Sequence, residues 1–215
     1  MSEEEQRVGE EGERERVFTP ESPSGVTALV LGAEVQLTEA DVELSTRLAS
    51  LGMLVFARAL SRDGATLSDR EATALATEEL SALIATEGVE PDAVVLAGVG
   101  RGGTVAVLCA CRVDGAALVL DIGGPLIYAE LDEGRSVQPL EMLLNLSTPL
   151  FMAFGEEVSD QDRGWIESSL SQFARTYDIV TAPVAGSALF SAESEADEPV
   201  WEATKAFLQL HLDNL

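Results

Sequence analysis

The fold is decided by Ala93-Val-Val-Leu-Ala-Gly-Val-Gly-Arg-Gly-Gly-Thr-Val-Ala-Val-Leu-Cys-Ala110. A short apolar run ends at Gly98, and a turn containing Gly100, Gly102 and Gly103 leads into an apolar helical pattern. This order predicts a strand, a tight turn and a helix. Two kinds of site use that geometry: a nucleophile elbow with the reactive side chain at its apex, and a phosphate-binding turn at a helix N-terminus. The apex here is Gly100, which has no side chain. The functional prediction therefore depends on which of these two kinds of turn contains this glycine.

The rest of the chain alternates between strand and helix patterns. Further strands are predicted at Thr27–Leu31, Met53–Ala57, Ala116–Leu120, Pro149–Phe154 and Ile179–Ala182, with a short edge strand at Val17–Thr19. Helices are predicted after capping boxes at Thr38 and Ser68, after the glycine turn as far as Arg112, and from Pro199. A further helix, between the last two strands, is predicted to carry Ile166, Leu170, Phe173 and Tyr177. Strands that are apolar throughout are buried on both faces. The alternation therefore predicts an α/β fold, a mostly parallel sheet with helices on both faces.

Length and charge limit the organisation of the chain and its partners. The 215 residues carry 38 acidic and 13 basic side chains, a formal net charge of −25. We expect a disordered acidic tail over residues 1–15 and a single domain over 16–215. The charge argues against nucleic acid and against anionic membrane surfaces as partners. With Lys205 as the only lysine, the composition suits a high-salt cytoplasm, although a protein that is simply very acidic would have the same composition.

The chain has no pattern of a signal peptide, a membrane span or a metal site. The N-terminus is acidic, and no apolar run reaches the length of about 18 residues that a membrane span requires. Cys109 and Cys111 lie two positions apart on a predicted helix, so they point to different faces and are not expected to form a disulfide. Zinc sites need several ligands at set spacings, which are missing here. We therefore expect a cytoplasmic protein with reduced thiols and without a metal or other cofactor.

One interpretation of the glycine turn is nucleotide binding. Gly98-x-Gly100-x-x-Gly103 matches the dinucleotide fingerprint after a predicted strand and before a predicted helix. Asp121 ends the next predicted strand, 18 residues past Gly103, about where an acid that binds the ribose belongs. Nucleotide binding by residues 98–103 is thus one hypothesis.

A second interpretation comes from a resemblance. Residues 98–110 resemble the elbow of the dienelactone hydrolase family, an α/β-hydrolase group whose motif reads Gly-x-Cys-x-Gly-Gly. The similarity extends over residues 17–212: to the helix and strand within Thr38–Phe56, the strand Thr148–Gly155, the loop Pro183–Leu189 and the closing helix Trp201–Leu212. The resemblance implies an α/β-hydrolase fold, and the order and spacing of these segments favour it over the nucleotide-binding fold.

The resemblance also implies that the catalytic triad is degenerate. The nucleophile position falls on Gly100, the histidine position on Ser187 and the acid position near Val158, with Glu157 and Asp160 as neighbours. Acyl transfer needs a nucleophile, a base that activates it and a group that orients the base. Glycine supplies no nucleophile, and serine is not a base near neutral pH. The resemblance therefore implies a hydrolase fold without hydrolysis.

Four further residues are candidates for the pocket of this fold. The backbone N–H of Arg101 occupies the position of an oxyanion-hole donor, and with Gly102 it opens the predicted helix, where an anion could bind. Glu34 follows the first long strand and is expected near the pocket mouth. Asp121 could line the same cleft, although capping of a neighbouring turn is the favoured alternative. The only histidine, His211, is expected at the end of the last helix.

Three functional hypotheses follow. The first is a pseudo-hydrolase that binds a small acidic or hydrophobic molecule in the former active-site cleft, or binds another protein. The second is an active hydrolase with a relocated site, in which Asp121, Glu157 or Asp160 activates water, directly or through a metal ion. The third is nucleotide binding by the glycine turn. The oligomeric state is not predicted.

Overall fold

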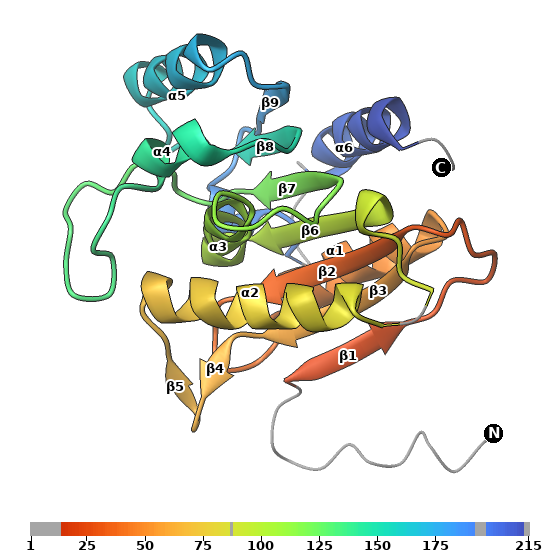
Figure 1. The fold of residues 1–215 in the computed structure, drawn as a ribbon. Coiled ribbons are helices and arrows are strands. Elements are labelled where there is room, and N and C mark those ends of the chain that lie inside the picture. The colour runs from red at the N-terminus through yellow and green to blue at the C-terminus, as the bar shows by residue number, and fades with distance from the viewer. Residues whose placement is uncertain (1–13, 87, 192–196, 213–215) are drawn as a thin grey trace.

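The computed structural model describes residues 14–86, 88–191 and 197–212. Its main element is a seven-stranded sheet with the order β1-β3-β2-β6-β7-β8-β9 (Figure 1). The strands are β1 (Glu15–Phe18), β2 (Thr27–Gly32), β3 (Leu54–Ala59), β6 (Val94–Val99), β7 (Leu118–Ile122), β8 (Leu150–Phe154) and β9 (Tyr177–Thr181). The edge strand β1 is antiparallel to β3, and every other pair is parallel. The predicted α/β class and mostly parallel sheet are confirmed.

Helices cover both faces of the sheet, and each face has its own apolar core. The longer helices are α1 (Glu39–Ser50), α2 (Asp69–Ile84), α3 (Arg101–Ala110), α5 (Asp160–Gln172) and α6 (Asp197–His211). In one core, side chains of the sheet pack against α2, α3 and α5. In the other core, they pack against α1 and α6. In Figure 1, α2 and α3 lie in front of the sheet and α1 lies behind it. Burial on both sides explains why the central strands are apolar throughout.

Both predicted capping boxes are present. The hydroxyl oxygen of Thr38 accepts a hydrogen bond from the Asp41 N–H, and the Asp41 carboxylate accepts one from the Thr38 N–H. Ser68 and Glu71 make the same reciprocal pair at the start of α2. Each box satisfies two backbone N–H groups that a helix N-terminus otherwise leaves free. The two boxes therefore set the residues at which α1 and α2 begin.

Several boundaries differ from the sequence prediction. Residues 1–13 of the predicted tail lie outside the described residues. Glu15 belongs to β1, and the Arg14 carbonyl accepts a hydrogen bond from the Ala59 N–H. The predicted end of the tail at residue 15 is therefore wrong. The predicted helix through Tyr177 is also wrong, because α5 ends at Gln172 and Tyr177 begins β9. Pairing with β8 across the sheet overrides the apolar spacing that suggested helix. The last helix includes Pro199 but begins at Asp197.

Some elements were not predicted. They are the small hairpin β4 (Ser61–Arg62) and β5 (Ala65–Thr66), the short helix α4 (Pro139–Met142), and three 3₁₀ turns at Pro91–Ala93, Leu143–Asn145 and Gly186–Ala188. These pieces are too short for a hydrophobic period to reveal them. No helix within the described residues is long and apolar enough to cross a membrane.

Candidate functional site

The turn after β6 has the backbone geometry of an elbow. Gly100 lies at φ 55° and ψ −130°, a conformation that side-chain-bearing residues rarely adopt. Its N–H donates to the Ile122 carbonyl at 2.7 Å, and its carbonyl accepts from the N–H groups of Gly103 and Thr104. The strand therefore reverses into α3 within one residue, as a nucleophile elbow requires.

The glycines around the elbow are present for different reasons. A Cβ at Gly98 would lie 2.3 Å from the Gly102 carbonyl carbon, and one at Gly102 would lie 2.0 Å from the Leu31 carbonyl oxygen. A Cβ at Gly103 would meet the Asp121 carboxylate at 2.2 Å. These three glycines let α3 pack directly against the ends of β2, β6 and β7. A Cβ at Gly100 would meet nothing within 4 Å, so the apex position points into open space and its glycine is favoured by backbone conformation alone.

The loops that follow β7, β8 and β9 touch one another at the same edge of the sheet. The Gly186 N–H donates to both carboxylate oxygens of Glu157, at 2.9 and 3.1 Å. A Cβ at Gly123 or at Gly155 would clash with the backbone of Gly186 at 2.3 and 2.0 Å. These contacts hold Ser187, the next residue, beside the elbow. The residue that fixes this loop is Glu157. It lies one position before Val158, near which the resemblance places the acid of the triad.

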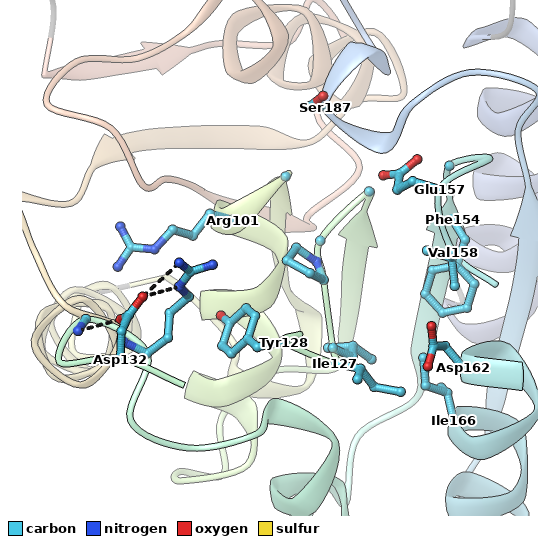
Figure 2. Close-up of a pocket in the computed structure, with 18 of the residues that line it drawn as sticks. Arg101, Ile127, Tyr128, Asp132, Phe154, Glu157, Val158, Asp162, Ile166 and Ser187 are labelled. Carbon is cyan, nitrogen blue, oxygen red and sulfur yellow. Dashed lines mark hydrogen bonds and ion pairs between the residues drawn. The ribbon is translucent and has the colours of Figure 1, made fainter. Parts of the chain in front are cut away.

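A cavity of about 720 Å³ opens between the elbow and these loops (Figure 2). The positions assigned to the degenerate triad, Gly100, Val158 and Ser187, all line it. Figure 2 shows Phe154, Val158 and Ile166 on one side, opposite Arg101 and Tyr128, with Glu157 above Phe154 and Ser187 at the top of the view. The remaining walls come from residues 66–68, 123–128, 132, 134 and 135, and from Gly155 and Asp162. The tertiary structure thus brings together the three positions that the resemblance singled out.

Arg101 lines the cavity, but its guanidinium is occupied. It pairs with the buried Asp69 carboxylate, with Nη2 and Nε at 2.8 and 2.9 Å from Oδ1. The same guanidinium donates to the carbonyls of Leu67 and Ala33. The other Asp69 oxygen accepts a hydrogen bond from the Tyr128 hydroxyl at 2.6 Å. Burial and this carboxylate raise the pKa of Tyr128, so the phenol stays a hydrogen-bond donor that ties its loop to α2.

A second guanidinium on the cavity wall is also paired. Arg135 contacts one Asp132 oxygen through Nη2 at 2.8 Å and Nε at 3.2 Å. The other Asp132 oxygen accepts from the backbone N–H groups of Gly134 and Arg135, both at 2.8 Å. Arg135 lies over the Tyr128 ring, 5.3 Å from its centroid. Its hydrogen bonds lower the pKa of Asp132, which keeps the pair ionised at neutral pH.

Asp121 does not line the cavity, so the expectation that it lines the cleft is wrong. The alternative, that it caps a neighbouring turn, is correct. The residue is 1% exposed, and its Oδ1 accepts a hydrogen bond from the Gly124 N–H at 2.9 Å. Its Oδ2 is buried without a hydrogen-bond partner among the described residues. The side chain lies beneath the elbow, pressed against Gly103 and Gly124. Burial raises the pKa of Asp121 well above its ordinary value.

Glu34 lies at a second, smaller hollow on the other side of the elbow. This hollow, of about 410 Å³, is lined by residues 33–34, 38–41 and 99–102, together with Ser187 and Ser191. The hollow lies beyond the carboxyl ends of the neighbouring strands β2 and β6, from which the chain continues toward opposite edges of the sheet. Open α/β sheets often bind ligands at such a point. Glu34 is exposed, whereas Gly102 is buried and lines this hollow rather than the larger cavity.

The other candidate groups are dispersed. Among the described residues, no three His, Cys, Asp or Glu side chains form a set that could hold a metal ion. Cys109 and Cys111 are free and buried. His211 packs against Phe207 at the end of α6, with the ring centroids 4.5 Å apart and the planes tilted by 54°. Because His211 is the only histidine in the sequence, the cavity has no imidazole.

The comparisons with known proteins agree with this geometry. No protein-family model and no curated protein matches the chain. Among solved structures, it is similar to a Klebsiella pneumoniae protein described as a dienelactone hydrolase, with TM-score 0.70, 18% identity and 89% of each chain covered. The chain has the α/β-hydrolase fold.

Two further structures extend the likeness. The dienelactone hydrolase of Anabaena variabilis matches with TM-score 0.68 at 13% identity, over 92% of this chain and 91% of that one. Est1E from Butyrivibrio proteoclasticus matches with TM-score 0.71 at 11% identity, over 93% and 94%. The fold implied by the sequence resemblance is therefore confirmed over 89–93% of this chain.

Sequence reasoning missed much of the cavity wall. Residues 123–128, 132, 134 and 135 all line it, although the sequence between the end of β7 and Pro149 contains no recognisable motif. Two signals were available: the pair Gly123-Gly124 directly after a buried strand, and Asp132 three residues before Arg135. Neither signal shows that this segment folds back onto the start of α2, because that contact spans about 60 residues of sequence.

Proposed function

We propose that this protein is a non-hydrolytic protein with the α/β-hydrolase fold, which binds a small molecule in the cavity beside Gly100. The observation that carries the proposal is the bare apex of the elbow. The backbone has the conformation that presents a nucleophile, and the space above it is open, yet the residue there has no side-chain atom. A covalent acyl intermediate needs such an atom.

The surroundings of the apex support the same conclusion. Ser187 lines the cavity, but no side chain among the described residues hydrogen-bonds to its hydroxyl, so no base is in place to activate it. Glu157 uses both carboxylate oxygens to hold the Gly186 N–H. The elements of a hydrolytic site are thus present as a framework, while the reactive atoms are missing.

The two rival hypotheses have weaker support. A relocated hydrolytic site would need Asp121, Glu157 or Asp160 to act on a common water molecule, but Asp121 is buried beneath the elbow and only Glu157 lines the cavity. Nucleotide binding would need Asp121 to reach a ribose, and the same burial prevents that. The glycines of the fingerprint serve the packing of α3 against the sheet instead.

The test combines an activity assay with a binding assay. Purified protein is expected to hydrolyse p-nitrophenyl acetate and p-nitrophenyl butyrate no faster than its Glu157→Gln variant does, and neither should form an acyl-enzyme detectable by mass spectrometry. Turnover that disappears in the Glu157→Gln variant would overturn the proposal. A neutral aromatic probe, 2-naphthylmethanol, should bind the wild type and should be lost in Val158→Trp, which fills the cavity from its rim.

A further inference from the structure

The cationic groups of the cavity are neutralised by the protein itself. The Arg101 guanidinium pairs with the buried Asp69 and donates to two backbone carbonyls. The Arg135 guanidinium pairs with Asp132 through two nitrogens and lies on the Tyr128 ring. A guanidinium whose charge is already balanced by a carboxylate attracts an incoming carboxylate or phosphate less strongly than a free one does.

The anionic groups of the cavity are not neutralised in the same way. Glu157 and Asp162 both line it, and within the described part of the chain neither forms an ion pair with an arginine or lysine. Glu157 accepts from one backbone N–H, and Asp162 accepts from Ser159. Two guanidinium groups are thus accompanied by four carboxylates once Asp69 and Asp132 are counted, in a chain of net charge −25.

Much of the rest of the wall is apolar, although Thr66, Ser68 and Ser187 also line the cavity. Pro125, Ile127, Phe154, Val158 and Ile166 face the space between the elbow and α5. Such a surface favours the body of an apolar ligand, and the polar groups at its edge select the charge of the ligand's polar end.

On this basis, which rests on the proposed function, we propose that the cavity takes ligands with an apolar body and a neutral or positively charged polar end, and that it rejects carboxylates and phosphates. The paired guanidiniums remove the attraction for an anion, and the unpaired carboxylates add repulsion. Of the two ligand types that the sequence suggested, acidic and hydrophobic, the wall charges select the hydrophobic one.

The test uses three probes with the same ring and different charges: 2-naphthylmethylammonium, 2-naphthylmethanol and 2-naphthoate. Their dissociation constants are measured by equilibrium dialysis at low ionic strength, where charge effects are least screened. The ammonium and the alcohol should bind, and the carboxylate should bind at least about tenfold more weakly than the alcohol. Binding of the naphthoate as tight as that of the alcohol, or tighter, overturns the ligand class while leaving ligand binding intact. Failure of all three probes to bind overturns the proposed function as well.

A charge variant tests the cause. Asp132→Asn keeps an oxygen for the N–H groups of Gly134 and Arg135 but removes the charge that neutralises the Arg135 guanidinium. It should strengthen naphthoate binding about threefold to tenfold relative to naphthylmethanol binding measured on the same variant. Glu133→Gln is the matched control, because Glu133 lies in the same loop and does not line the cavity. Equal gains in both variants, or no gain in Asp132→Asn, would show that the Arg135 pair does not set the selectivity.

Discussion

Replacing Gly100 by alanine tests whether the elbow still stores backbone strain. The residue lies at φ 55° and ψ −130°, and an L-amino acid held in a sparsely populated region of this kind costs about 1–3 kcal/mol. The new methyl group would meet nothing within 4 Å, so no steric clash adds to that cost. Alanine also lowers the entropy of the unfolded chain, which offsets about 0.4–1 kcal/mol. The expected loss in the free energy of unfolding is therefore about 0.5–2 kcal/mol.

Urea denaturation followed by circular dichroism measures this loss. In a thermal scan, each kcal/mol should lower the Tm by about 2–4 °C for a chain of this size. Two other glycines calibrate the result. Gly164 lies inside α5 with open space around it and without a positive φ, so Gly164→Ala should stabilise the protein by about 0.5–1 kcal/mol. Gly102→Ala, whose methyl would lie 2.0 Å from the Leu31 carbonyl oxygen, should cost about 3 kcal/mol or more.

The free energies of unfolding of the three variants, compared with one another, test whether position 100 is strained. If Gly100→Ala is as stable as the wild type or more stable, position 100 is not strained, and the turn is not an elbow in the energetic sense. If it is as damaging as Gly102→Ala, the space at the apex is closed and the cavity is smaller than about 720 Å³.

Three further predictions concern buried polar groups. Below about pH 4 both the folded and the unfolded chain hold the Asp121 proton. Above that pH the unfolded chain releases the proton, whereas the folded chain keeps it because the pKa of Asp121 is raised. The contribution of Asp121 to the free energy of unfolding therefore falls as the pH rises, until the pH passes the pKa of the folded state. Asp121→Asn should therefore gain stability relative to the wild type between pH 4 and pH 7 in urea titrations, and a constant difference would contradict the buried neutral acid. Tyr128→Phe removes the hydrogen bond to the Asp69 carboxylate and should cost about 1–3 kcal/mol in the same assay, whereas an unchanged midpoint would mean that this bond adds nothing. Burial raises the pKa of the Cys111 thiol to about 12, so iodoacetamide at pH 8 should label Cys109 and Cys111 only after unfolding, and rapid labelling of the native protein would refute their burial.

The sequence predicted the fold where local patterns encode it. The apolar strands, the two capping boxes and the glycine turn each depend on residues within a few positions of one another. Their order predicted the sheet and a tight turn at Gly100, and the resemblance to the dienelactone hydrolase family favoured an elbow over a nucleotide-binding turn. The pattern misled at Tyr177, where an apolar residue at helical spacing belongs to a strand, because pairing with β8 is a contact that spacing along the chain does not reveal.

The sequence by itself also determined that the apex lacks a nucleophile and that the single histidine lies at the end of the last helix. Tertiary structure decided the rest of the site. It buried Asp121 beneath the elbow, gave Glu157 the contact with the loop of Ser187, and paired Arg101 with Asp69, which lies 32 residues earlier in the chain. The physical reason is the range of the interactions: backbone conformation follows from neighbouring residues, whereas burial and charge pairing depend on which distant loops the packed sheet brings together at one edge.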